Sequence, residues 1–251
     1  MDDIQLSVIV CANRGGEYFT DALDSLVVAR QGRTNIEVIL VANGGWLPEE
    51  SIVKYFDRVE FTSESGLGNA RNLGVSVARG RWVTFFDNDD LLDIDYIGEI
   101  ETLIARVPHR TVIFAKAVFM TAEGAVLPWR WRLENLPPTI GCLIAHPFTG
   151  ATMVIPKELF VIIGGYKWNG YAEDYHLTLR ILYSKPPIGI IRAPKAYYYY
   201  RQHANTMSGD VIKKIRGVRE VQIYFARRGY IWLWVGVLAS GVRLLLRRIR
   251  S

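Results

Sequence analysis

The pattern of apolar and polar positions predicts a strand, a helix and a second strand at the start of the chain. Residues 6–11 and 36–42 are almost continuous runs of β-branched and other apolar residues. Such runs are typical of strands that are covered on both faces, as in a parallel sheet. Between them, residues 17–30 place apolar side chains at helical spacing. These three segments predict a βαβ unit.

The pattern continues with two more strands and another helix. Residues 55–62 and 82–86 have the composition of strands, and residues 69–78 between them have that of a helix. Alternating strands and helices indicate an α/β protein with an open, mostly parallel sheet flanked by helices. Ligands of such sheets bind beyond the carboxyl ends of the strands, so we expect the functional site there.

Beyond residue 110 the predicted elements are less regular. Residues 111–120 and 149–155 predict strands, and residues 172–183 predict a helix. A short helix is expected to begin at Pro156, because proline suits the first turn of a helix. Residues 121–138 contain Glu-Gly, Trp-Arg-Trp-Arg and Pro-Pro and are expected to form a loop that covers a substrate.

Composition is that of a globular protein with one substantial core. Of the 251 residues, 50% are apolar, which is enough for one catalytic unit with an appendage. The formal net charge is +5, but from Arg201 onward eleven basic residues face only two acidic ones, a net charge of +9. Positive charge confined to one apolar-rich segment, without a zinc-finger or RNP-type motif, argues against nucleic acid as a partner. The two cysteines lack metal-ligand spacing and the amino terminus lacks a signal-peptide pattern, so we expect a reduced, cytoplasmic protein.

An acidic run follows the strand predicted at residues 82–86. Asp87, Asp89 and Asp90 place three carboxylates within four residues. Like charges this close repel one another unless a cation lies among them, and hard oxygen ligands favour Mg²⁺ or Mn²⁺. Carboxylates of this kind commonly share a divalent ion with a substrate diphosphate. The alternative is an acidic turn at the start of the next helix, to which Asp93 would also contribute.

Five separated segments, taken in order, make the chain similar to a known family. They are Ser7-Val-Ile-Val-Cys-Ala-Asn13-Arg14, Ser65-Gly-Leu-Gly-Asn-Ala-Arg-Asn72, Asp87-Asn-Asp-Asp90, Tyr171-Ala-Glu-Asp-Tyr-His-Leu-Thr-Leu-Arg180 and Tyr200-Arg-Gln-His203. From about residue 6 to residue 208, the chain resembles the nucleotide-sugar-dependent glycosyltransferases of the GT-A fold, in particular the large inverting family 2. The resemblance implies a GT-A domain over residues 1–208. Beyond it, the composition of residues 209–251 predicts a basic, apolar helical tail.

The resemblance assigns Asp87 and Asp89 to the family's metal-binding DXD motif. Asp89 is then expected to ligate Mg²⁺ or Mn²⁺ directly, and Asp87 to lie nearer the ribose or the metal's water shell. A metal held there neutralises the charge that builds on the departing nucleotide. Some relatives use a histidine in the segment that contains His203 as a further metal ligand. A lone surface histidine is as often incidental.

Glu173 and Asp174 correspond to the family's ED motif at the start of a helix. The resemblance makes Asp174, with Glu173 beside it, the catalytic general base toward the acceptor hydroxyl. A carboxylate takes this proton as the new C1–O bond forms, when the hydroxyl becomes acidic. For an isolated Glu-Asp pair, the alternative is that both carboxylates stabilise the helix N-terminus through its dipole.

Other matched positions are expected to bind the nucleotide sugar. Arg71 and Arg201 are expected to hold the nucleotide, since a guanidinium binds phosphate in a fixed fork. Gly68 permits close approach of the backbone to a ligand. Asn13 and Arg14 are expected to line the nucleotide pocket. The alternative for Arg71 is an ordinary exposed arginine on a helix.

The chain departs from the family pattern after the second strand. The family commonly has Asp-Asp-Gly-Ser or Asp-Asn-Gly-Ser there, whose first Asp contacts the nucleobase, whereas this chain has Ala42-Asn43-Gly-Gly. Ala42 has no side-chain group for that contact, but Asn43 can hydrogen-bond the edge of a base. A UDP-sugar is the expected donor, although this departure leaves the preference for uridine open.

The basic tail contains an apolar segment. Residues 229–242 are uncharged, and arginines lie on both sides of them. As a helix these residues span about 21 Å, short of the roughly 30 Å hydrocarbon core of a bilayer. Tryptophans beside arginine clusters suit an interfacial helix, so residues 211–251 are expected to bind an anionic membrane surface. The alternative is a closing helix that packs on the body or on a partner subunit.

Together these features predict a metal-dependent, inverting glycosyltransferase, of the hexosyltransferase type, at the inner face of the cell membrane. Its donor would be a nucleoside diphosphate sugar, and its acceptor a saccharide or lipid-linked hydroxyl in surface-glycan synthesis. Two alternatives stay open. One is a nucleotidyltransferase of similar fold, which would release pyrophosphate; the other is a non-catalytic, membrane-associated relative, which Ala42 suggests.

Overall fold

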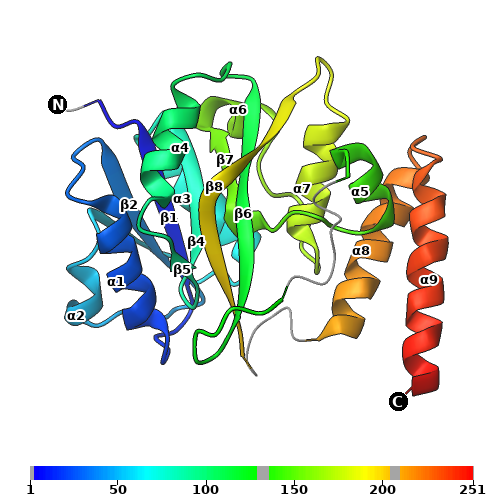
Figure 1. The fold of residues 1–251 in the computed structure, drawn as a ribbon, viewed down its shortest axis with the longest axis horizontal. Helices are drawn as coiled ribbons and strands as arrows, with labels where there is room; N and C mark the ends of the chain where they lie inside the picture. Colours follow the sequence, from blue (N-terminus) through cyan, green and yellow to red (C-terminus); the bar gives the residue numbers. More distant parts are fainter. Residues whose placement is uncertain (1–2, 129–135, 204–209, 251) are drawn as a thin grey trace.

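The computed structural model describes residues 3–128, 136–203 and 210–250. Its centre is an eight-stranded sheet with the order β3-β2-β1-β4-β7-β6-β8-β5 (Figure 1). The strands are β1 (Leu6–Ala12), β2 (Ile36–Ala42), β3 (Arg58–Phe61), β4 (Trp82–Asp87), β5 (Leu91–Leu92), β6 (Thr111–Thr121), β7 (Met153–Pro156) and β8 (Gly189–Gln202). Only β5 and β7 run against the other six strands. The mostly parallel α/β sheet predicted from the sequence is therefore confirmed.

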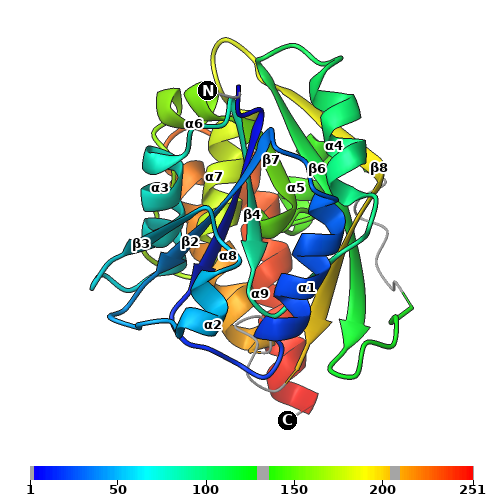
Figure 2. The same ribbon diagram turned by 90° about the vertical axis from the view of Figure 1, so that its left-hand side faces the viewer.

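Helices cover both faces of the sheet. They are α1 (Phe19–Arg30), α2 (Glu50–Val53), α3 (Leu67–Val77), α4 (Tyr96–Ile104), α5 (Pro138–Ile144), α6 (Lys157–Ile162), α7 (Glu173–Leu182), α8 (Val211–Ala226) and α9 (Leu233–Arg250). Buried side chains of α1 and α4 form one hydrophobic core with the sheet, and those of α3, α6, α7 and α8 form a second core. Figure 2 shows α1 and α3 on opposite sides of the strands.

The first βαβ unit forms as its hydrophobic pattern predicts. Every residue of β1 and β2 is buried, which is the environment that continuous β-branched runs require. The two strands pair in parallel, with Leu6 beside Ile36. On the other face, Gly74 lets α3 approach closely, because a Cβ there would lie 2.4 Å from a methyl carbon of Ile9.

One strand in the second half is shorter than its sequence predicts. Residues 149–155 begin with a 3₁₀ turn over Gly150–Thr152, and β7 starts only at Met153. A Cβ at Gly150 would lie 2.6 Å from Nη1 of Arg71, so this turn passes very close to a buried cation. The helices predicted after Pro156 and at residues 172–183 are confirmed as α6 and α7. The loop predicted at residues 121–138 lies in part outside the described residues.

The C-terminal helices form an antiparallel pair along one side of the molecule, shown at the right of Figure 1. Helix α4 was not predicted, whereas α8 lies within the helical tail predicted over residues 209–251. The apolar tail segment predicted at residues 229–242 becomes helical only from Leu233, and the helix continues to Arg250. Within the part of the chain that the structure describes, no helix is both long and apolar enough to cross a bilayer.

Candidate active site

Three parallel strands end side by side at one edge of the sheet. Their register places Cys11 of β1 beside Asp87 of β4, and Ala12 of β1 beside Ala42 of β2. The segments that follow these strands therefore meet at this edge, where open α/β sheets bind ligands. The predicted site residues that these strand ends carry are Asn13, Arg14, Asn43, Asp87 and Asp89.

Arg71 and Asp87 form a largely buried ion pair at this edge. Arg71 is 2% exposed; its Nη2 donates to Oδ1 of Asp87 at 2.9 Å and its Nη1 to the hydroxyl of Tyr166 at 3.4 Å. The guanidinium also lies over the rings of Phe85 and Tyr166, 5.2 Å and 5.6 Å from their centroids. Burial raises the pKa of Asp87, Arg71 lowers it, and the charge of Asp89 raises it again. Arg71 is thus a buried cation among carboxylates and not an exposed helix arginine.

Asp89 and His203 form a second close pair. Nε2 of His203 lies 2.9 Å from Oδ2 of Asp89, and the two side chains are 11% and 31% exposed. The imidazole packs against Tyr18, with 4.8 Å between ring centroids. Among the residues that the structure describes, no three His, Cys, Asp or Glu side chains are grouped closely enough to hold a metal ion. Asp87, the third predicted member of such a group, contacts Arg71.

Asp90 fixes the turn that carries the acidic run. Its carboxylate is 1% exposed and accepts hydrogen bonds from the hydroxyl of Tyr198 at 2.7 Å and the backbone N–H of Arg201 at 2.8 Å. Burial raises the pKa of Asp90 well above its usual range, and the nearby carboxylates raise it further. The Arg201 guanidinium donates to the carbonyl oxygens of Asp89 at 3.0 Å and Ala122 at 2.6 Å. A contact of Arg201 with a nucleotide diphosphate stays a prediction.

Asp174 lies in the first turn of α7 and is held by backbone donors. Its Oδ2 accepts the N–H of Gly150 at 3.1 Å, and its Oδ1 accepts the N–H of Tyr175 at 2.8 Å. Nδ1 of His146, whose side chain is buried, lies 3.4 Å from Oδ1 of Asp174. Burial lowers the pKa of His146, which favours the neutral imidazole, and the charge of Asp174 opposes this effect. The carboxylate of Asp174 is therefore fixed in position without a full positive charge beside it.

Glu173 is the more perturbed carboxyl group of the pair. Burial, together with the charge of Asp174, raises the pKa of Glu173 to about 7, and Arg71 partly offsets the shift. A Cβ at Gly68 would lie 3.1 Å from Cβ of Tyr166, closer than usual, and in ordinary contact, at 3.7 Å, with Cγ of Glu173. Gly68 thus permits a close approach of α3 to this part of the site.

Gly150 packs against both Arg71, the partner of Asp87, and Asp174. A Cβ built there would lie 2.6 Å from Nη1 of Arg71 and 2.9 Å from Cβ of Asp174. Arg71, which binds Asp87, and Asp174 therefore contact the same glycine. The charge of Asp174 also raises the pKa of Asp87. The structure brings together Arg71, Asp87, Glu173 and Asp174 of the predicted site, whose roles stay predictions.

Three residues of this arrangement were missed by sequence reasoning: His146, Gly150 and Tyr166. None belongs to a segment that we matched to the family. The only sequence signal was Gly150 within a predicted strand, since an isolated glycine there often marks a close backbone approach.

Asn43 is the buried polar residue at the end of β2. It is 6% exposed, and its Oδ1 has no hydrogen-bond partner among the described residues. An unpaired buried acceptor is costly, which makes Asn43 a candidate for contact with a ligand donor. Nearby, Asn88 donates to the backbone carbonyl of Arg14 at 3.2 Å. The nucleotide-binding roles of Asn13, Arg14 and Asn43 stay predictions.

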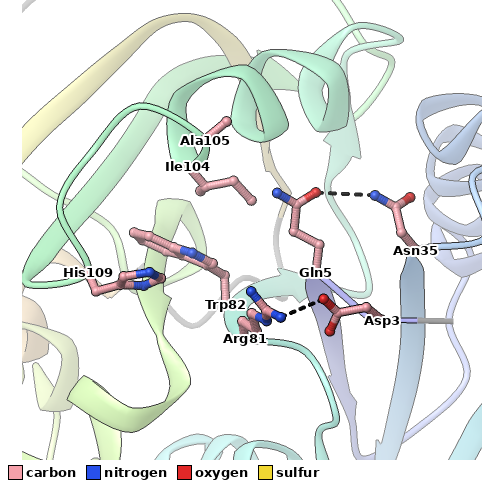
Figure 3. Close-up of a pocket in the computed structure, with 8 residues that line it drawn as sticks. All are labelled: Asp3, Gln5, Asn35, Arg81, Trp82, Ile104, Ala105 and His109. Atoms are coloured by element: carbon pink, nitrogen blue, oxygen red, sulfur yellow. Dashed lines mark hydrogen bonds and ion pairs between the residues drawn. The ribbon is translucent and has the colours of Figure 1, made fainter. Parts of the chain in front are cut away.

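A cavity of about 330 Å³ lies away from these residues. Figure 3 shows its lining, which includes Gln5, Asn35, Trp82 and His109. Gln5 precedes β1, and Trp82 begins β4. The cavity is therefore at the amino ends of the strands, at the opposite edge of the sheet from the carboxylates.

Comparisons with solved structures identify the fold. Staphylococcus aureus TarS, residues 1–349 in complex with UDP-GlcNAc, matches with a TM-score of 0.64 and 21% identity, over 88% of this chain and 66% of that chain. The mannosyltransferase PcManGT from Pyrobaculum calidifontis, in complex with GDP-Man and Mn²⁺, matches with a TM-score of 0.69 and 16% identity, over 96% of this chain and 72% of that one. Both structures support a GT-A-type fold.

Comparisons with sequences identify the family. An uncharacterised glycosyltransferase from Rickettsia typhi is 26% identical over 187 residues, which cover 70% of this chain and 58% of that protein. This chain therefore spans little more than half the length of that relative. The model of the family named glycosyl transferase family 2 matches residues 7–168. The chain thus belongs to glycosyltransferase family 2, as its five motifs predict.

Proposed function

We propose that this protein is an inverting glycosyltransferase that moves a sugar from a nucleoside diphosphate sugar to an acceptor hydroxyl, with Mg²⁺ or Mn²⁺ as cofactor. One observation carries the proposal. Arg71, paired with Asp87, and the carboxylate-bearing Asp174 both pack against Gly150. A charge-neutralising group and a proton acceptor therefore lie close together, as displacement of a nucleotide by a hydroxyl requires.

Asp89 and His203 would hold the metal, with Asp87 near its water shell. A carboxylate oxygen and an imidazole nitrogen lie 2.9 Å apart, and both kinds of atom are ligands of Mn²⁺-type ions. When bound, the ion would neutralise charge on the departing diphosphate. Arg71 adds a fixed positive charge beside Asp87.

Asp174 would act as the general base. As the acceptor oxygen bonds to C1 of the sugar, the bond from C1 to the diphosphate oxygen breaks, and the hydroxyl proton passes to Asp174. Hydrogen bonds from Gly150 and Tyr175 hold this carboxylate in place. Entry of the acceptor opposite the leaving group inverts C1. Glu173, whose pKa is raised to about 7, would lie beside the reacting groups as a second catalytic carboxyl.

The donor would be a nucleoside diphosphate sugar, with a UDP-sugar expected. The TarS structure holds UDP-GlcNAc and the PcManGT structure holds GDP-Man with Mn²⁺, which supports this class of donor. Arg71 and Arg201 would serve the diphosphate, and Gly68 would allow close approach. Asn13, Arg14 and Asn43 would line the nucleotide pocket. The acceptor would be a saccharide or lipid-linked hydroxyl in surface-glycan synthesis at the inner membrane face.

The test measures nucleotide release from UDP-, GDP- and dTDP-sugars with and without Mn²⁺. We expect a metal-dependent release of nucleoside diphosphate. Asp89→Asn and Asp174→Asn, shown to be folded by thermal unfolding, should lower the rate at least about a hundredfold. Release of pyrophosphate would instead identify a nucleotidyltransferase. Variants that retain the parental rate would refute the proposed roles.

A further inference from the structure

Helix α9 has two apolar faces, of which only one is covered. Its inner face packs on the body: Leu233 and Val237 are buried, and so are Gly236 and Ser240. Its other face, here called the outer stripe, exposes between 42% and 70% of each large apolar side chain. The outer stripe consists of Trp234, Val235, Leu238, Val242, Leu245 and Leu246. At 100° per residue these six positions fall within about 120° of the helix circumference, so they form one continuous strip.

The inner face is fixed by buried polar contacts, so the outer stripe cannot turn inward. The Ser240 hydroxyl donates to Oε1 of Gln222 at 3.1 Å, and Nε2 of Gln222 donates to the carbonyl of Leu143 and to the hydroxyl of Tyr175, each at 3.3 Å. A Cβ at Gly236 would clash with Leu143 and Gln222. The helix is thus seated in one rotation about its axis, and that rotation presents the outer stripe to the surroundings.

The charged residues of α9 are all basic. No acidic residue follows Glu220 in the chain, whereas Arg243, Arg247, Arg248 and Arg250 lie in the second half of α9. The exposed Lys214 and Arg216 lie at the start of α8, which runs antiparallel to α9 (Figure 1). The start of α8 and the end of α9 therefore form a common basic end of the helix pair, in which the acidic Asp210 is paired with Lys213 at 3.4 Å.

The basic end lies beside the candidate active site. Burial lowers the pKa of His146, and the positive charge of Lys214 lowers it further. Lys214 is therefore near His146, which lies 3.4 Å from Asp174. Tyr175, the residue after Asp174, is tied to α9 through Gln222 and Ser240. The helix pair and the start of α7, which carries Asp174, are parts of one packed unit.

We infer that the outer stripe is a docking surface for an anionic lipid bilayer. An exposed strip of large apolar side chains with arginines and no acids matches the acyl boundary and the negative headgroups of such a surface. A second copy of the chain is a poorer partner across the stripe, because α9 packed on α9 offers the arginines no acidic residue. Because α8 packs between α9 and α7, docking along α9 would bring the bilayer to the side of the molecule that carries Asp174. This step rests on the proposed function: for a glycosyltransferase docked in this way, the acceptor would be a membrane-borne molecule.

The test is flotation of the full chain with vesicles of phosphatidylcholine and phosphatidylglycerol, and with vesicles of phosphatidylcholine alone. We expect binding to the anionic vesicles that weakens as salt rises. Val235→Asn combined with Leu238→Gln should lower the bound-to-free ratio about tenfold or more. The matched control, Val161→Asn with Ile162→Gln, removes similarly exposed apolar groups from α6 and should bind as the parent does.

A second pair of variants tests the charge contribution. Lys214→Gln with Arg216→Gln should weaken binding and flatten its salt dependence, whereas Lys54→Gln with Arg106→Gln, on other surfaces, should change neither. Equal flotation of the stripe variant and its control, or no flotation of the parent, would overturn the inference. A dimer in light scattering that the stripe variant dissociates would do so too, by showing a second copy as the occupant.

A failure of the proposed function can be distinguished from a failure of the docking inference by measuring donor hydrolysis. Donor hydrolysis in vesicle-free buffer needs no membrane, so the stripe variant should hydrolyse nucleotide sugar at the parental rate. A parent that floats but never cleaves a donor would refute the proposed function and leave the docking surface standing.

Discussion

The Nε2 atom of His203 lies 2.9 Å from Oδ2 of Asp89, although 114 positions separate the two residues in the chain. We predict that His203→Ala raises the Mn²⁺ concentration needed for half-maximal donor hydrolysis at least about tenfold, because one of the proposed metal ligands is lost. Calorimetric titration with Mn²⁺ measures the same effect without turnover. His109→Ala, a substitution at the distant cavity, should leave the Mn²⁺ requirement unchanged. Identical titrations for the parent and the His203 variant would exclude ligation by His203.

Gly150 provides a test of the close packing between Arg71, which pairs with Asp87, and Asp174. An added methyl group would overlap with Arg71 and Asp174, at 2.6 Å and 2.9 Å. We predict that Gly150→Ala lowers kcat more than about tenfold, because displacements near 1 Å in a catalytic site are costly. Gly241→Ala is the matched control, since the added methyl group would meet no heavy atom within 4 Å beyond its chain neighbours and the adjacent backbone of its own helix. Unchanged kcat in a folded Gly150→Ala protein would show that the spacing at Gly150 does not matter for turnover.

Much of the sheet could be predicted because a strand that is buried on both faces consists almost entirely of apolar residues. Residues 6–11 and 36–42 are apolar at nearly every position, and each residue of β1 and β2 is buried. Helix α8 was predicted only as part of a helical tail, without bounds of its own. Its buried face includes Gly217 and Gln222 between basic residues, so its apolar signal is weak. Gln222 is fully buried because three hydrogen-bond partners surround it, and two of these, Leu143 and Tyr175, are remote in sequence.

In the candidate site, too, residues of local motifs could be predicted and residues placed by long-range packing could not. Asp87 and Asp174 were predicted because each belongs to a short local motif at the end of a predicted element. The contribution of Gly150 depends on packing against Arg71, which is distant in the sequence. The environment of Arg201 also could not be predicted, because its guanidinium contacts carbonyl oxygens from two other segments.

Arg71 allows a stability prediction. Arg71→Met keeps the bulk of the buried side chain but leaves the carboxylate of Asp87 without its cation. We predict a loss of about 2–4 kcal/mol in the free energy of unfolding, measured by urea denaturation. Arg58→Met removes the exposed pair with Glu60 and should cost at most about 1 kcal/mol. Equal losses for the two variants would contradict a dominant role for the buried pair.

Glu173 makes the stability of the metal-free protein depend on pH. Its pKa in the folded chain is raised to about 7 from an ordinary value of 4.5, chiefly by burial. Between these two pH values the folded state binds more protons at Glu173 than the unfolded state does, so this group lowers stability as pH rises. We predict that Glu173→Gln removes this decline. Its free energy of unfolding, relative to the parent, should increase from pH 4.5 to pH 7 by up to about 3 kcal/mol. Urea denaturation across this range measures the difference. Glu158→Gln, a carboxyl of α6 outside the site, is the control, and parallel pH profiles for the parent and the Glu173 variant would refute the raised pKa.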